Sequence, residues 1–231
     1  MRPVCKKEPE EILDGKGIKE DYKDHSEARS MLTCNLGRYC SYCEVFIRDP
    51  QLEHIQPKSI HSALEYKWSN FLLACGLCNS KKSDKDVVLK EVHLPHLNNT
   101  YLSLCYKEAG VVIVNPTLDK ISQQHAENLL KLVGFDGFDK QDSCSQYRRE
   151  IWDIAEICLR RYEAGEYQLD LLMEYIKAVG YWSVWFTVFK THDEVRKALI
   201  EEFPGTAKEC FDADNHYEPI NRNPNNESDP V

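Results

Sequence analysis

The stretch YCSYCEVFIRDPQLEHIQPKS, residues 39–59, begins with a C-x2-C pair, and a second such pair follows at Cys75 and Cys78. Each pair places two thiolates on one tight turn, and two such turns complete a tetrahedral site of four thiolates, the arrangement typical of structural Zn²⁺. The sequence therefore predicts a closed zinc site at Cys40, Cys43, Cys75 and Cys78. The alternative is four unrelated buried cysteines.

The composition is that of a water-soluble globular chain rather than a membrane or secreted one. No apolar run reaches the about 18 residues needed to cross a bilayer, and the start MRPVCKKEPEE lacks the apolar core of a signal peptide. We therefore expect no membrane association and a cytoplasmic location. In a reducing compartment, clustered cysteines among the ten present indicate metal binding more than disulfides.

The charge is unevenly distributed along the 231 residues. The formal net charge is −9, yet residues 36–90 hold eight basic and six acidic side chains, so this segment carries +2 and the remainder −11. Phosphate affinity depends on Lys and Arg. Only the central segment is therefore expected to meet a nucleic acid.

The Glu-His pair in the strand-like stretch LEHIQPKS is the candidate centre of chemistry. His54 can be a packed structural histidine, a zinc ligand or a catalytic base, and four thiolates leave zinc no need of it. Glu53 and Asn79, which follows Cys78, offer oxygen ligands that suit Mg²⁺ or Mn²⁺. Neighbours in a strand point to opposite faces, so a bulge or a strand end near Pro57 is needed to bring Glu53 and His54 to one phosphate.

The order C-x2-C, E-H-I-x-P-x-S, W-x-N-x-L-x-x-C-x2-C-N-x-x-K over residues 40–82 resembles the HNH endonucleases, which have a ββα-metal fold. The resemblance implies that His54 is the general base and that Glu53, where the family often has Asp, holds the catalytic metal with Asn79. It also implies that Asn70 is the middle motif residue, which orients the loop carrying the base.

Other polar residues are weaker candidates. The candidate phosphate contacts are the lysines Lys58, Lys81, Lys82 and Lys85, although each can equally be a solvated side chain. His61 can be a second active-site group, but a surface histidine is the simpler interpretation. His93 and His96 resemble half of a metal site that lacks a nearby third ligand.

The chain divides into four predicted parts within an α+β fold. These are an N-terminal arm and helix (1–36), a zinc-ribbon-supported ββα-metal core (37–95), a mostly helical partner-docking domain (96–204) and a disordered Asn/Asp/Pro-rich tail (205–231). A hairpin is expected around residues 108–110. The aromatic stretch GYWSVWFTVF, residues 180–189, is either an exposed interface or helical core, and we favour core.

A closer resemblance extends beyond the HNH motif. The start MRPV, the HNH core and VVIVNPTLDKISQQHAENLLKLVGFDG (111–137) look like the nuclease subunit of Septu-type anti-phage defence systems and the similar nuclease of some retron systems. This resemblance implies a bacterial DNA-cutting effector restrained or directed by an ATPase subunit of the ABC/SMC-like type. The alternatives are a non-catalytic zinc-ribbon binding module and an RNA-cleaving toxin nuclease.

Overall fold

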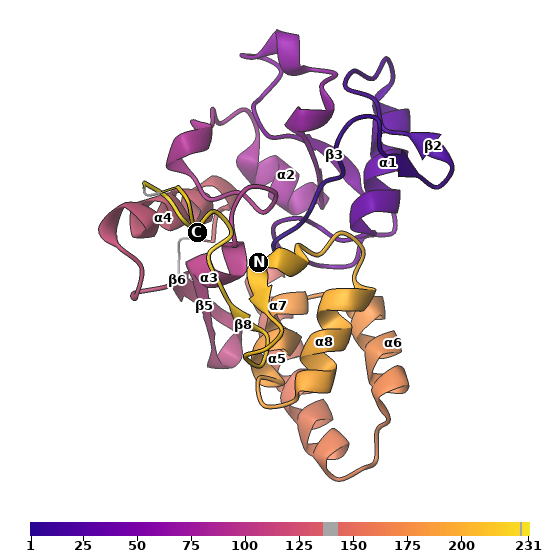
Figure 1. The fold of residues 1–231 in the computed structure, drawn as a ribbon, viewed down its shortest axis with the longest axis vertical. Coiled ribbons are helices and arrows are strands. Elements are labelled where there is room, and N and C mark those ends of the chain that lie inside the picture. Colours follow the sequence, from indigo (N-terminus) through magenta and orange to yellow (C-terminus); the bar gives the residue numbers. More distant parts are fainter. Residues whose placement is uncertain (136–142, 227) are drawn as a thin grey trace.

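The computed structural model describes residues 1–135, 143–226 and 228–231, so the parts of the predicted domains at 136–142 and 227 lie outside the described residues. Figure 1 shows two halves, with α1, β3 and α2 in one and α5, α6, α7 and α8 in the other. Each half has its own cluster of buried apolar side chains. The structure is a mixture of helices and two-stranded sheets.

The helix predicted within the N-terminal part is α1, His25–Leu36. The Asp24 carboxylate accepts a hydrogen bond of 2.8 Å from the backbone N–H two residues on, which satisfies one of the unpaired donors of the first turn. Gly37 ends the helix at a φ of 76°, a left-handed value that glycine adopts without strain. Ala28 and Leu32 on the apolar face are fully buried.

The predicted functional residues lie on three consecutive elements. Strands β3, Gln51–His54, and β4, Phe71–Ala74, pair antiparallel, with Glu53 opposite Leu72 and His54 opposite Phe71. Helix α2, Gly76–Lys82, follows β4 directly. All four residues of β4 are buried, so this strand anchors the segment in the protein interior.

The predicted hairpin is confirmed. Strand β5, Leu104–Lys107, pairs antiparallel with β6, Val111–Val114, across the short helix η4, Glu108–Gly110. Gly110 has a φ of 66°, and a Cβ there would lie 2.7 Å from the backbone of Arg148. The tight turn of the hairpin therefore packs directly against the backbone of α5.

The second half is helical, as expected. Its helices, with the one that leads into it, are α4 (Lys120–Val133), α5 (Ser143–Glu163), α6 (Leu169–Val179), α7 (Trp182–Val188) and α8 (Asp193–Glu202). The aromatic stretch that includes α7 forms the centre of this half, since Trp185 and Phe186 are completely buried and the Trp182 ring stacks on Phe186 at 4.4 Å. It is core and not an exposed interface.

The prediction of a disordered tail is wrong for the described residues of 205–231. This segment contains η5 (Lys208–Cys210), β7 (Phe211–Asp212) and β8 (Glu218–Pro219), and β7 and β8 pair antiparallel. The buried Asn99 side chain donates hydrogen bonds of 2.8 Å to the carbonyls of Cys210 and Ile220. The terminal Val231 is 1% exposed. Hydrogen bonds to buried asparagines hold a segment whose composition offers little apolar surface.

The remaining elements are short. They are β1 (Ile12–Leu13), β2 (Lys16–Gly17), η1 (Ser62–Leu64), η2 (Trp68–Asn70), η3 (Leu89–Glu91) and α3 (Thr100–Ser103). Across the described residues, no helix combines the length and the apolar character that a bilayer span requires.

Candidate active site and cysteine cluster

The four predicted zinc ligands meet at one point. The sulfur atoms of Cys40, Cys43, Cys75 and Cys78 all lie within 4.8 Å of one another. Cys43 Sγ and Cys75 Sγ are 3.6 Å apart, well beyond the about 2.05 Å of a disulfide bond. In each pair, the backbone N–H of the second cysteine points at the sulfur of the first, at 3.5 and 3.4 Å. The donor set and the turns fit a tetrahedral four-thiolate zinc site.

The cysteine turns connect the two halves of the molecule. Glu44, directly after Cys43, has a φ of 67° and is buried. Its carbonyl accepts a hydrogen bond of 2.9 Å from the Tyr181 backbone, and its carboxylate accepts one from the Ser183 hydroxyl. A Cβ at Gly180 would overlap the same carbonyl. The first cysteine turn is therefore packed against the start of α7 and cannot shift independently of it.

His54 is at the end of β3 with its ring half-buried. Its Nε2 lies 2.9 Å from the carbonyl oxygen of Glu65. A carbonyl only accepts hydrogen bonds, so Nε2 carries the proton and the neutral ring keeps its lone pair on Nδ1. Burial lowers the pKa of His54 and the neighbouring His25 lowers it further, whereas the Glu65 carbonyl opposes both. His54 therefore stays neutral near pH 7 with one basic nitrogen.

Asn70 holds the loop that follows His54. Its side-chain Nδ2 donates to the carbonyls of Gln56, at 2.9 Å, and Leu64, at 3.2 Å. The side-chain Oδ1 accepts a hydrogen bond of 2.8 Å from the Gln56 backbone N–H. The backbone carbonyl of Asn70 accepts one of 2.9 Å from the Ile55 backbone N–H. Asn70 thus uses both ends of its amide to fix the backbone between His54 and Leu64.

Glu53 lies on the opposite face of β3 from His54. The side chain is 2% exposed, and its Oε1 is 3.0 Å from the ammonium of Lys82 in α2 and 3.2 Å from the Tyr42 hydroxyl. Burial raises the pKa of Glu53, while Lys82 and Tyr42 act in the opposite direction. The β3–β4 register stays regular through His54. The structure therefore shows no bulge that would bring Glu53 and His54 to the same face.

Asn79 lies on α2 and faces the same side of β3 as Glu53. Its Nδ2 donates 2.8 Å to the side-chain oxygen of Gln51, the strand neighbour of Glu53 on that face. Within the described part of the chain, no hydrogen bond joins Asn79 to Glu53. The oxygen donors on this face nevertheless fit a hard divalent cation by type, and the Lys82 ammonium already places a positive charge against Glu53.

The four predicted phosphate contacts have different environments. Lys82 is completely buried and donates to the His54 carbonyl at 2.7 Å, so its assignment as a nucleic-acid contact is wrong. Lys58 is exposed and paired with Glu65. Lys81 and Lys85 reach the carbonyls at the C-terminal end of α4. The sequence identified these as charges but could not show which of them faced inward.

Two histidines near the site differ in their involvement. The ring of His25, at the start of α1, lies 5.3 Å from that of His54, and its Nε2 is 3.2 Å from the same Glu65 carbonyl. Sequence reasoning missed this contact because His25 has no motif around it. His61 instead pairs with Asp86 at 2.7 Å, which is the surface role that the sequence favoured.

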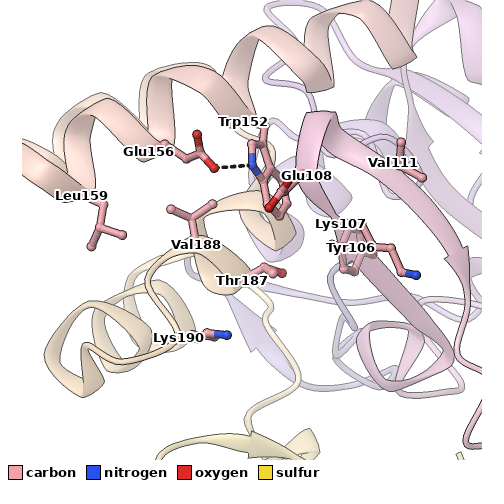
Figure 2. Close-up of a pocket in the computed structure, with 10 residues that line it drawn as sticks. All are labelled: Tyr106, Lys107, Glu108, Val111, Trp152, Glu156, Leu159, Thr187, Val188 and Lys190. Carbon is pink, nitrogen blue, oxygen red and sulfur yellow. Dashed lines mark hydrogen bonds between the residues drawn. The ribbon is translucent and has the colours of Figure 1, made fainter.

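A pocket of about 680 Å³ lies away from these residues, between the β5–β6 hairpin and helices α5 and α7. Figure 2 shows the residues that line it. The Trp152 indole donates a hydrogen bond to Glu156 at 3.0 Å, and Lys107 of β5 and Lys190, which follows α7, also line the pocket. None of the predicted site residues lines this pocket.

Residues 40–85 match the family model of the HNH endonucleases. The matched segment contains both cysteine pairs, His54, Asn70 and Asn79, so this part of the chain is similar to the HNH domain of endonucleases. No curated protein gives a significant match to the chain.

Proposed function

We propose that this HNH domain is a metal-dependent endonuclease that hydrolyses phosphodiester bonds of DNA, and that β3, β4 and α2 form its ββα-metal core. The observation that carries the proposal is the state of His54. Its Nε2 is held by the Glu65 carbonyl, which leaves Nδ1 as a basic atom on a rigid strand end.

The base acts on a water molecule. Neutral His54 accepts a proton at Nδ1 from a water in line with the scissile phosphorus, and the resulting hydroxide attacks. The lowered pKa of His54 keeps the ring unprotonated at neutral pH. Asn70, by fixing the loop from Gln56 to Leu64, keeps the Glu65 carbonyl and therefore the ring in place.

The four cysteines would hold a structural zinc ion, because four thiolates leave no open position for substrate. Cys75 caps the start of α2 and Cys78 lies in its first turn, so a bound ion would fix the helix that carries Asn79. Glu53 and Asn79 would hold the catalytic Mg²⁺ or Mn²⁺, with Gln51 adjacent. When bound, that ion supplies charge stabilisation at the phosphate and the leaving 3′ oxygen.

We further propose that the chain is the nuclease of a Septu-type anti-phage defence complex, with an ABC/SMC-like ATPase as its partner. The support is the sequence resemblance over the HNH core, the MRPV start and residues 111–137. The partner would not dock on the 180–189 stretch, whose aromatic side chains are buried. The partner would instead dock on an exposed surface elsewhere on the helical half.

One observation favours a second candidate, a non-catalytic zinc module. Glu53 is buried and paired with Lys82, on the face of β3 opposite to His54. In that case the pair is a structural ion pair and no second metal is needed.

A cleavage panel separates these candidates. The purified chain, alone and with its ATPase partner, is incubated with DNA and RNA in Mg²⁺, Mn²⁺ or EDTA. The proposal expects cleavage of DNA only when a divalent ion is present. Cleavage of RNA alone supports the toxin alternative, and the absence of cleavage under every condition supports the non-catalytic module.

A further inference from the structure

His93, His125 and Asp229 meet at a second point, outside the segment that matches the HNH family model. Their ligand atoms all lie within 4.8 Å of one another. His93 follows η3, His125 belongs to α4 and Asp229 belongs to the C-terminal tail, which ends beside α4 in Figure 1. Three segments far apart in the chain thus each contribute one nitrogen or oxygen donor to the same point.

The two imidazoles are aimed by the groups around them. His93 Nε2 is 2.9 Å from one carboxylate oxygen of Asp229, and His125 Nδ1 is 2.9 Å from the other. The backbone N–H of His93 donates to the carbonyl of His125 at 3.3 Å, which fixes the two segments relative to each other. The rings cross at 87° with centroids 5.6 Å apart.

The other nitrogen of His93 also has a partner. The Ser103 hydroxyl lies 2.8 Å from His93 Nδ1 and 3.1 Å from the Asn99 carbonyl. In the tautomer with its proton on Nδ1, His93 donates to Ser103 and presents the Nε2 lone pair to an ion shared with the Asp229 carboxylate. An outer hydrogen bond of this kind is usual for a metal-bound histidine.

Burial makes the cluster closed on one side and reachable on the other. The His93 side chain is 0% exposed, whereas His125 and Asp229 are 11% and 14% exposed. The partly exposed edge provides a path for an ion and for a water as a further ligand.

We propose that His93, His125 and Asp229 bind a divalent transition-metal ion of the zinc class, at a site separate from the four-cysteine site. Two imidazole nitrogens and one carboxylate oxygen are a common protein ligand set for Zn²⁺ and similar ions. His96, the partner that the sequence offered for His93, takes no part. Its Nδ1 is buried without a hydrogen-bond partner among the described residues.

The site gives the tail a function. Asp229 is the ligand from the C-terminal segment, so ion binding fastens that segment against α4 and the loop after η3. Removing the ion leaves the tail held by weaker contacts, such as the Asn98 amide on the Val231 carbonyl at 3.2 Å. The C-terminal segment should then become accessible to proteases.

Metal content tests the proposal. The full chain is reconstituted with excess Co²⁺ or Zn²⁺ in the presence of Mg²⁺, which fills the oxygen-ligand site, and unbound ion is removed. We expect about two transition ions per wild-type chain, and about one in Asp229→Ala and His125→Ala, since each variant loses one ligand of three. His61→Ala, which removes a surface histidine paired with Asp86, is the matched control and should keep about two.

Cobalt spectra keep the result interpretable if a variant misfolds. The four-thiolate site gives an intense sulfur-to-cobalt charge-transfer band, and it should persist in Asp229→Ala while the weaker bands of the nitrogen and oxygen site disappear. Limited proteolysis should cut the tail faster in that variant. A wild-type chain that holds a single transition ion, or an Asp229→Ala chain that keeps both, overturns the proposal.

Discussion

Replacing Lys82 by methionine should destabilise the fold by about 3–5 kcal/mol, the cost of breaking a buried ion pair on one side. The Lys82 ammonium is 3.0 Å from Glu53 Oε1, and the two side chains are 0% and 2% exposed. Methionine fills similar space but leaves the carboxylate in the interior with the Tyr42 hydroxyl, at 3.2 Å, as a hydrogen-bond donor. It also removes the donor to the His54 carbonyl.

Urea denaturation with zinc in excess measures this free energy. The double variant Lys82→Met/Glu53→Gln should lose clearly less than the sum of its single variants, since it removes both charges of the pair. Lys58→Met is the matched control, because its exposed pair with Glu65 at 3.0 Å should be worth only about 0–1 kcal/mol. A loss below about 1 kcal/mol for Lys82→Met, or strict additivity in the double variant, would refute the buried-pair reasoning.

Three further predictions concern the site and its support. In a pH–rate profile of DNA cleavage, the loss of rate on the acid side should have its midpoint below about pH 6.5, the ordinary histidine pKa. The reason is that burial lowers the pKa of His54, so the base is lost only as pH falls through that lowered pKa. A midpoint above about pH 6.5 contradicts this. Gly180→Ala should lower the melting temperature far more than Gly165→Ala, since both have positive φ but only the first Cβ meets neighbouring atoms, those of the first cysteine turn. Asn70→Ala should reduce the cleavage rate constant with little change in zinc content, because it frees the loop and not the cysteines; metal analysis beside single-turnover kinetics checks both.

Local patterns predicted the parts of the fold that depend on neighbours in sequence. The two C-x2-C pairs predicted the cysteine cluster because two knuckles have one compact way to share an ion. The N-terminal helix and the hairpin around residues 108–110 were predicted from local sequence patterns, and both are present. The role of Asn70 in tying the loop was also expected, and its hydrogen bonds fit that role.

The remaining features depend on contacts between distant segments, which no local pattern encodes. Lys82 was expected to face phosphate, but the position of α2 over β3 places it against Glu53. His93 gains its partners from His125 and Asp229, and the second of these lies in a tail whose composition indicated disorder. Polar residues whose partners come from far along the chain are thus the least predictable.

The most direct test of the central claim compares DNA cleavage by His54→Ala and His61→Ala at equal zinc content. Both variants remove one histidine from the same domain, but only His54 has its Nε2 held by the Glu65 carbonyl, while His61 pairs with Asp86 on the surface. A lost general base should cost about 10²–10⁴-fold in rate. We expect that loss in His54→Ala and near-wild-type cleavage in His61→Ala. Wild-type cleavage by His54→Ala would contradict the assignment of the base and the proposed mechanism with it.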